Sequence, residues 1–303
     1  MQPERVDLHC HSTASDGRLT PAQLVERAKQ LGLKALALTD HDTVAGLGLF
    51  QAAGQARNLE TIPGVEVSTD YPTGTMHLLG LLIDSQNQAF RAFLKQLADG
   101  RQVRNPQIIE RLSQLGLAIT MDEVEEEAGV TSAGIEGAGL SEKSIGRPHI
   151  AAVLIRKGYV ESKQAAFDKY LAKGRPAYVP RFLVSPEECI NQIHSASGLA
   201  VLAHPPYIMA KDDAELERIV GELKHKGLDG IEVYFSTHTR EQTALCERLA
   251  GEFDLLVTGG SDFHGDLGRG GTKVELGSGA GGRLCVSYEL VQKLKERKAR
   301  GRR

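Results

Sequence analysis

The chain has 303 residues, enough for one large or two ordinary domains, and its 41% hydrophobic content supports a substantial core. A net charge of −3 excludes a global field that would draw the protein to nucleic acid or to an anionic membrane, so any nucleic-acid contact has to be local. No apolar run approaches the roughly 20 residues that cross a bilayer, the N-terminus is too polar for a signal peptide, and the four scattered cysteines indicate no disulfide framework. A cytoplasmic protein is predicted.

Strand and helix patterns alternate through the first 83 residues. Apolar runs at 6–9, 33–39, 61–68 and 77–83 predict buried strands. A helix is predicted to begin after Thr20, where Pro21 suits the first helical position, and to end at Gly32. Continuous apolar strands separated by helices favour a parallel sheet that is covered on both sides.

The middle of the chain differs, because its pattern is largely helical from residue 88 to about 180. Strand and helix patterns return at Ser185, and strands are predicted at 198–203, 228–235 and 255–258. Repeated βα units with about six or seven strands predict a barrel.

We therefore predict a discontinuous barrel of residues 1–99 and 185–290, a helical insertion at 100–184 that caps the substrate, and a basic C-terminal tail at 291–303. The eight glycines of residues 265–282 indicate a flexible loop or an irregular hairpin.

Histidines and carboxylates follow the predicted strands. His9 and His11 are separated by one residue, so both imidazoles point to the same face of a strand. The other candidate ligands in such positions are Asp16, His41, Glu66, His77, His204, Asp262 and His264. The carboxyl ends of barrel strands surround one site, so these side chains can meet there. Their number predicts two or three divalent ions, with Mn²⁺ expected first and Zn²⁺ or Fe²⁺ as alternatives.

Several neighbouring residues have predicted supporting roles. Cys10 points away from the two histidines beside it, which excludes it as a ligand. Asp40 and Asp42 are predicted to orient imidazoles from behind. His238, in the loop after the strand at 231–235, is a candidate for protonating the leaving oxygen, and a surface histidine is the alternative.

These motifs and their order resemble those of the PHP (polymerase and histidinol phosphatase) family, whose fold is a distorted (βα)7 barrel of the TIM type. The resemblance implies that one metal is held by His9, His11, Glu66 and Asp262. Glu66 would bridge to a second metal that His77 and His204 also hold. A third would be held by Asp16, His41 and His264, and family members with three metals often have histidine at position 16, so the filling of this site stays open.

Metal ions bridged by a carboxylate lower the pKa of a shared water toward neutrality, and the resulting hydroxide attacks phosphorus in line. The expected reaction is therefore phosphoester hydrolysis. The residues expected to take part in catalysis are Glu66, His204, Asp262 and His238.

The segments Gly146-Arg147-Pro148-His149, 177–180 and 201–205 resemble one PHP subgroup, which includes nucleoside 3′,5′-bisphosphate phosphatases and a 5′-to-3′ exoribonuclease. The resemblance implies removal of the 3′-phosphate from substrates such as 3′,5′-adenosine bisphosphate. The alternatives are exonuclease action on short 5′-phosphorylated RNA, histidinol-phosphate hydrolysis and a non-catalytic module. Neither DNA nor a membrane is an expected partner.

Cationic side chains outside the ligand set are expected to hold the substrate. Arg147 and His149 are the first candidates, because a Gly-Arg-Pro-His turn presents both within the insertion. Arg101 and Arg104 lie near its predicted start, and a solvated arginine is the alternative for each. Ser12 would donate to a phosphoryl oxygen or cap a turn.

Overall fold

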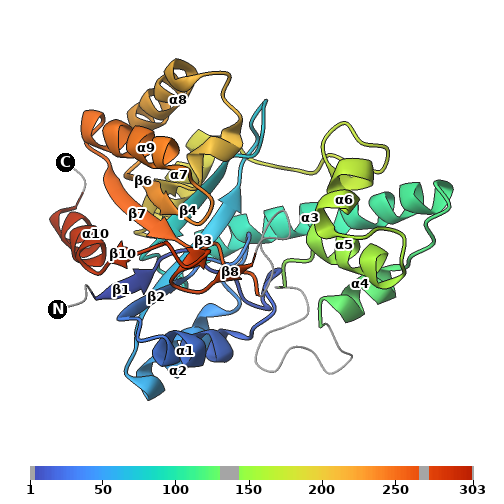
Figure 1. Ribbon diagram of the computed structural model, residues 1–303, viewed down its shortest axis with the longest axis horizontal. Coiled ribbons are helices and arrows are strands. Elements are labelled where there is room, and N and C mark those ends of the chain that lie inside the picture. The colour runs from blue at the N-terminus through green and yellow to red at the C-terminus, as the bar shows by residue number, and fades with distance from the viewer. Residues whose placement is uncertain (1–3, 130–142, 266–272, 302–303) are drawn as a thin grey trace.

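The computed structural model describes residues 4–129, 143–265 and 273–301. A barrel-shaped sheet surrounded by helices forms its larger part, and a long helix leads from it to a smaller helical part (Figure 1). The strands of the sheet, each next to its neighbours, are β10 (Val286–Ser287), β1 (Arg5–Asp7), β2 (Ala35–Leu38), β3 (Glu60–Ser68), β4 (His77–Leu81), β5 (Leu199–Leu202), β6 (Gly230–Phe235) and β7 (Leu256–Gly260).

The two ends of the sheet also meet. The N–H of Leu8, just after β1, donates to the carbonyl oxygen of Gly259 in β7 at 3.2 Å, and Cys10 forms a parallel bridge with Phe263. The sheet is thereby nearly closed, which confirms the predicted α/β barrel fold.

The strand directions correct the prediction of a parallel sheet. Most neighbouring strands run parallel, but β4 is antiparallel to both β3 and β5, and β10 is antiparallel to β1. Only residues 69–76 join β3 to β4, too few for the crossover of about a dozen residues that parallel neighbours need. His77 therefore begins β4 opposite Ser68, at the carboxyl end of β3.

Six helices of the described chain accompany this sheet: α1 (Pro21–Gln30), α2 (Leu47–Arg57), α7 (Pro186–Ser195), α8 (Asp213–His225), α9 (Arg240–Glu252) and α10 (Glu289–Arg300). The predicted start of α1 is confirmed, because Thr20 caps it in a capping box with Gln23. Alternating strand residues divide between two buried clusters. Leu36 and Leu38 pack with residues of α1 and α2, whereas Ala35 and Ala37 belong to a cluster that α10 covers.

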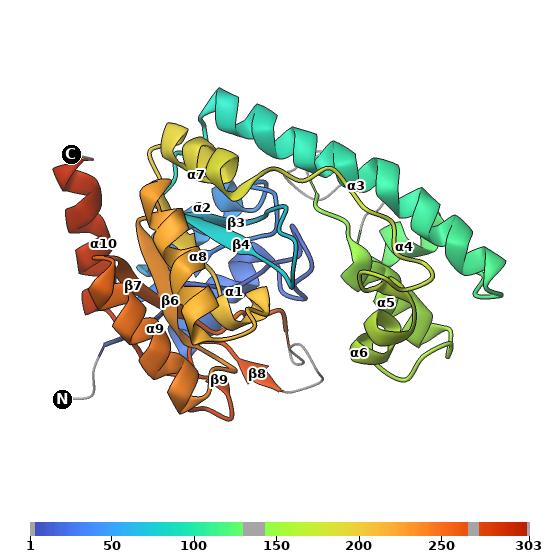
Figure 2. The ribbon, with the colours of Figure 1, turned by 90° about the horizontal axis from the view of Figure 1, so that it is seen from above.

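The helical part has a hydrophobic core of its own. It is formed by α3 (Gln88–Gln114), α4 (Met121–Glu127), α5 (Arg147–Arg156), α6 (Lys163–Ala166) and a π-helical turn (Phe167–Leu171). Helix α3 joins the two parts, since Leu94 and Leu97 pack in the barrel core and Ile108 and Leu112 in the helical core. The chain then returns along α3 to α7 (Figure 2). The predicted limit at residue 100 falls inside α3, and the predicted domain limits stay predictions.

Three smaller observations complete the fold. β8 (Val274–Glu275) and β9 (Gly279–Ala280) form a short hairpin within the predicted glycine-rich segment, of which residues 266–272 lie outside the described chain. The four cysteines are free thiols, and three of them are buried. None of the helices in the described ranges combines the length and apolar character needed to cross a membrane.

Candidate metal centre

The structure gathers all nine predicted ligands at one end of the barrel. His9, His11 and Asp16 follow β1, His41 follows β2 and forms a bridge with Glu66 of β3, and His77 begins β4. His204 follows β5, and Asp262 and His264 follow β7. The antiparallel direction of β4 is what brings its first residue to this end, where the parallel strands finish.

Four of these side chains form a compact group. Nε2 of His9 and Nε2 of His11 lie 3.2 and 3.1 Å from Oε2 of Glu66. The same two nitrogens lie 3.5 and 3.2 Å from Oδ1 of Asp262. Ligand atoms about 2.0–2.2 Å from a common ion are roughly 3.3 Å apart in a tetrahedral shell, so these spacings suit a divalent metal.

Glu66 has histidines on both of its carboxylate oxygens. Oε1 lies 2.5 Å from Nδ1 of His77 and 2.9 Å from Nε2 of His204. Oε2 faces the first group and also lies 3.1 Å from Nδ1 of His41. A carboxylate that bridges two cations needs this arrangement of ligands on its two sides.

A third group surrounds Asp16. Its Oδ1 lies 3.2 Å from Nε2 of His264 and 4.0 Å from both Nε2 of His41 and Nδ1 of His11. The rings of His11 and His264 stack with their centroids 4.0 Å apart. Spacing therefore permits this group, too, to hold an ion.

Unpaired polar atoms test whether a metal fits this site. Buried atoms without a hydrogen-bond partner include Nε2 of His9, both ring nitrogens of His11, Nδ1 of His41, Oε2 of Glu66, Oδ1 of Asp16 and Nδ1 of His204. Each such atom costs about 1–3 kcal/mol when nothing satisfies it. Imidazole nitrogens and carboxylate oxygens without thiolate suit Mn²⁺, Zn²⁺ or Fe²⁺, so the residues fit divalent metals.

The carboxylates of the centre are held in the form that binds cations. Burial alone raises the pKa of Glu66, but the charges of His41, His77 and His9 outweigh burial and hold this pKa well below its usual range. The pKa of Asp262 is likewise lowered, because His264 and His9 overcome the effect of burial. Both side chains therefore stay ionised.

Glu232 supports the centre and was not predicted from the sequence. It is fully buried, and its Oε1 accepts a hydrogen bond from Nδ1 of His9 at 3.0 Å. Its Oε2 accepts from the N–H of His204 at 2.8 Å. The first bond fixes the tautomer that turns the Nε2 lone pair of His9 toward the metal group. The sequence did contain a signal for Glu232, because a carboxylate within the otherwise apolar run of β6 needs a buried partner.

Asp40 and Asp42 do not contact an imidazole within the described residues, contrary to the prediction. Asp40 accepts hydrogen bonds from the N–H and hydroxyl of Ser12 and from the hydroxyl of Ser15. The chain is not extended at this point, because Asp42 has a φ of 54° in the left-handed region. The contacts of Ser12 match its turn-capping alternative.

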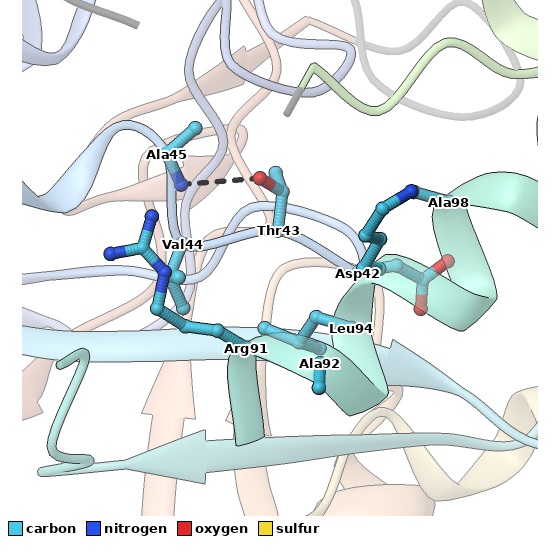
Figure 3. Close-up of a pocket in the computed structure, with 9 residues that line it drawn as sticks. Asp42, Thr43, Val44, Ala45, Arg91, Ala92, Leu94 and Ala98 are labelled. Carbon is cyan, nitrogen blue, oxygen red and sulfur yellow. Dashed lines mark hydrogen bonds between the residues drawn. The ribbon is translucent and has the colours of Figure 1, made fainter. Parts of the chain in front are cut away.

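Asp42 instead faces α3 and the returning chain. Its Oδ1 accepts from the N–H of Ser68 at 3.0 Å, and its Oδ2 accepts from Arg101 and Arg181. Figure 3 shows its side chain beside α3, at a cavity of about 240 Å³. The sequence did not single out Arg181, because only the folded chain brings it to α3.

The other residues predicted to bind substrate are largely buried, so they are not solvated surface residues. Arg101 and Arg104 are 8% and 4% exposed. Arg147 donates to the carbonyl of Leu171 at 2.9 Å and lies over two aromatic rings. His149 accepts from the N–H of Gly146, and burial lowers its pKa to about 4. Their roles in substrate binding stay predictions.

His238 lies beside the centre rather than in it. Its Nδ1 donates to the carbonyl of Val233 at 2.9 Å, and its Nε2 is buried without a partner. Its ring centroid lies 5.2 Å from that of Phe235, which in turn lies 5.4 Å from that of His204. Its part in catalysis stays a prediction.

Backbone strain marks the same region. His204, Asp262 and Asp42 have φ angles of 29°, 55° and 54°, which residues with a side chain rarely adopt. Such strain persists where the surrounding structure enforces it, commonly at functional sites.

Comparison with known proteins places this centre in a family. The PHP-domain family matches residues 7–126. A 5′-3′ exoribonuclease from Haemophilus influenzae is 35% identical over 262 residues, which cover 86% of this chain and 90% of that protein. The chain belongs to the PHP family. A 3′,5′-nucleoside bisphosphate phosphatase from Chromobacterium violaceum is 36% identical over 273 residues, 89% of this chain and 90% of that protein.

A solved PHP-like structure agrees with the fold. A protein from Bifidobacterium adolescentis, described as a metal-dependent phosphoesterase, superimposes with a TM-score of 0.81 at 31% sequence identity. The match covers 97% of this chain and 96% of that protein. Together with the ligand geometry, these similarities identify the protein as a metal-dependent phosphoesterase of the PHP family.

Proposed function

We propose that this PHP enzyme removes the 3′-phosphate of nucleoside 3′,5′-bisphosphates and leaves a 5′-nucleotide and inorganic phosphate. The observation that carries the proposal is Glu66, whose two oxygens face separate sets of histidines at the open end of the barrel. The similarity to the bisphosphate phosphatase of C. violaceum, which extends over 90% of that protein, supports the substrate class.

In this proposal the nine ligands hold two or three divalent ions, with Mn²⁺ as the first expectation and Zn²⁺ or Fe²⁺ as alternatives. Bound ions would supply Lewis acidity, which lowers the pKa of a coordinated water and neutralises charge on phosphoryl oxygens.

The protein's own side chains would fix the geometry of the reaction. Glu232 orients His9 and ties it to the backbone of His204, so ligands from two strands keep one spacing. The ring of Phe235 lies beside both histidines, with centroid distances of 6.2 Å to His9 and 5.4 Å to His204, and adds an apolar side to the centre. His238, behind Phe235, is the proposed proton donor to the leaving oxygen and would reach it through movement of the loop after β6.

The second candidate function is 5′-to-3′ exonuclease action on short 5′-phosphorylated RNA, which the similarity to the H. influenzae enzyme supports. Both reactions break an ester between phosphate and a 3′-oxygen of a nucleotide. They differ only in whether the phosphate carries a further nucleoside, so one metal centre suits both.

One assay separates these functions. Purified protein with Mn²⁺ is offered 3′,5′-adenosine bisphosphate, a 5′-phosphorylated RNA trimer and histidinol phosphate, and the release of phosphate and of nucleotide is followed. The proposal expects fast release of phosphate from the bisphosphate. Nucleotide release from RNA without that reaction would replace the first function by the second, and hydrolysis of histidinol phosphate alone would overturn both.

A further inference from the structure

Three buried arginines lie together where α3 meets the returning chain. Arg101 and Arg104 come from α3 and Arg181 from the segment before α7, and we call these three residues the arginine cluster. The side chains of Arg101 and Arg181 are 10% and 7% exposed, and Arg104 exposes 4% of its surface. Guanidinium groups are charged at any physiological pH, so this is a concentration of buried positive charge.

A single carboxylate offsets that charge within the described residues. Arg101 and Arg181 share one oxygen, Oδ2 of Asp42, at 2.5 and 2.9 Å. Arg104 makes no ion pair in the described ranges, and its Nε and Nη2 donate to the side-chain oxygen of Asn105. Burial and the charges of Arg101 and Arg181 lower its pKa, because little negative charge lies beside it. A buried charge without a partner is strongly unfavourable unless a ligand supplies one.

The cluster also has a buried hydrogen-bond donor without an acceptor. Nη1 of Arg181 is buried and has no partner. Nη1 of Arg101 lies against Gly146, where an added Cβ would come within 2.6 Å of it. Gly146 is the N-cap of the ten-residue helix α5, so the positive end of that helix faces the same place. Arg101 therefore links the shared carboxylate of Asp42 to the positive end of α5.

This point is joined to the metal centre through short connections. Asp42 directly follows His41, and its N–H donates to the carbonyl of Glu66 at 2.9 Å. On the other side, the N–H of Ser144, just before α5, donates to the carbonyl of Ala14, between His11 and Asp16, at 3.0 Å. The arginine cluster and the metal groups are thus linked through two backbone hydrogen bonds.

We propose that the arginine cluster binds the second phosphate of the substrate, the one that is not hydrolysed. The inference rests on the proposed function and deepens it by naming the residues that select substrates with two phosphates. Guanidinium groups pair with phosphate oxygens through two parallel hydrogen bonds, and three of them match the charge and the several oxygens of a phosphate dianion.

The burial of the cluster adds a restriction. An internal phosphodiester continues as chain on both sides, whereas a terminal phosphate has only one attachment and can approach buried side chains from one side. The proposed cluster therefore favours a terminal 5′-phosphate. The same arrangement serves a nucleoside bisphosphate and a 5′-phosphorylated RNA.

The first experiment compares two substrates in R181M. Adenosine 3′,5′-bisphosphate carries the second phosphate and 3′-AMP lacks it. The ratio of their kcat/KM values therefore measures how much the cluster's binding of the second phosphate contributes. We expect this ratio to fall about 10–100-fold, the effect of losing charge-assisted hydrogen bonds. The matched control is K95M, which removes an exposed cation of the same helix that pairs with Asp99, and it keeps the wild-type ratio. An unchanged ratio in R181M overturns the proposal.

A binding experiment separates this proposal from the proposed function. Metal-free protein is titrated with 5′-AMP, with adenosine and with inorganic phosphate. Wild-type protein should bind 5′-AMP and phosphate but not adenosine, and R181M should bind both anions at least about 10-fold more weakly. If the wild type hydrolyses neither substrate but this pattern holds, only the proposed function fails. Equal binding of 5′-AMP and phosphate by wild type and R181M overturns the proposed role of the cluster, whatever the enzymatic activity.

The variant R104M tests whether the arginine cluster serves only the stability of the fold. Arg104 has no ion pair within the described residues, so its removal relieves repulsion and should raise the Tm of the ligand-free protein by about 2–4 °C. The same variant should bind 5′-AMP more weakly. A residue that served only the fold would lower the Tm, and a lower Tm with unchanged 5′-AMP binding contradicts the proposal.

Discussion

The metal centre and the arginine cluster are opposite in charge but alike in construction. The centre brings three carboxylates and six imidazoles together, and many of their polar atoms are buried without partners. The cluster places two guanidinium groups on Asp42, holds that of Arg104 on Asn105 and leaves a buried donor of Arg181 unpaired. Each region has an excess of one charge that the described residues do not neutralise, which is why we propose cations for the first region and a phosphate for the second.

The two regions differ in what holds them in place. The ligands of the centre lie at strand ends of a nearly closed sheet, so the barrel alone fixes their spacing. The cluster depends on the docking of α3 and the returning chain against the loop after β2. Changes at the centre should therefore affect chemistry with little loss of fold, whereas changes at the cluster should affect both stability and substrate choice.

The largest expected effect comes from Glu66→Gln, because the two oxygens of Glu66 face both sets of histidines. We expect kcat/KM to fall at least about 10³-fold for every phosphate ester, since the loss of several kcal/mol of metal-dependent stabilisation has that effect. Metal content, measured on the purified protein, should fall by at least one ion. Glu60→Gln, on the same strand but outside the centre, is the control. Full activity and metal content in the Glu66 variant would exclude a bridging role.

Asp42→Asn tests the connection between the two regions. It removes the carboxylate shared by two buried arginines, and breaking a buried pair in this way costs about 3–5 kcal/mol of unfolding free energy. Urea denaturation measures that loss. Metal content should stay at the wild-type value, because Asp42 contacts no imidazole in the described residues. Loss of metal without loss of stability would restore the role that the sequence predicted for this residue.

The comparison also shows what the sequence can predict. The meeting of the candidate ligands was predictable because the ends of successive barrel strands must meet, whatever the details of packing, and His-x-His keeps its spacing on any extended chain. Even the reversed strand β4 did not disturb this prediction, since its first residue and the last residues of its neighbours share one end of the sheet. The sequence did contain a signal of that reversal. The segment between β3 and β4, residues 69–76, is too short for a crossover between parallel strands.

Other features needed the tertiary structure. A turn with a φ of 54° places Asp42, and hydrogen bonds from Ser12 and Ser15 hold Asp40, neither of which the strand pattern indicated. Arg181 lies in an irregular segment that has no periodic pattern, and it reaches Asp42 across a separation of 139 residues. No local property of the sequence distinguishes such a residue from a solvated arginine, because its partner is chosen by the packing of α3.

Glu232→Gln should have a smaller effect that is confined to the centre. The amide keeps an acceptor for one of the two hydrogen bonds but removes the charge that supports His9. Loss of such a carboxylate weakens metal affinity about 10–100-fold. Competition with a chelator, with metal-free protein as the starting material, measures this change. Glu247→Gln, which alters a carboxylate on the exposed side of the neighbouring Tyr234, is the control. Unchanged affinity in the Glu232 variant would mean that packing alone positions His9.

The smallest expected effect concerns His149, which lies between the two regions. Burial lowers its pKa to about 4, below the value near 6.5 that it has in the unfolded chain. The unfolded state therefore binds the proton more readily, and the contribution of this neutral imidazole to stability is present above pH 6.5 and is lost as the pH falls toward 4. At pH 5.5 the loss amounts to roughly 1 kcal/mol relative to pH 8.

His149→Gln isolates that contribution. Glutamine at this third position of α5 can still accept the hydrogen bond from the N–H of Gly146, so the cap is kept while the titrating group is removed. Urea denaturation at several pH values should show a shallower loss of stability between pH 6.5 and 4.5 in the variant than in the wild type. If the two pH profiles coincide, the imidazole takes up its proton in the folded protein, and α5 must then present a cation rather than a neutral ring to the space between the metal centre and the arginine cluster.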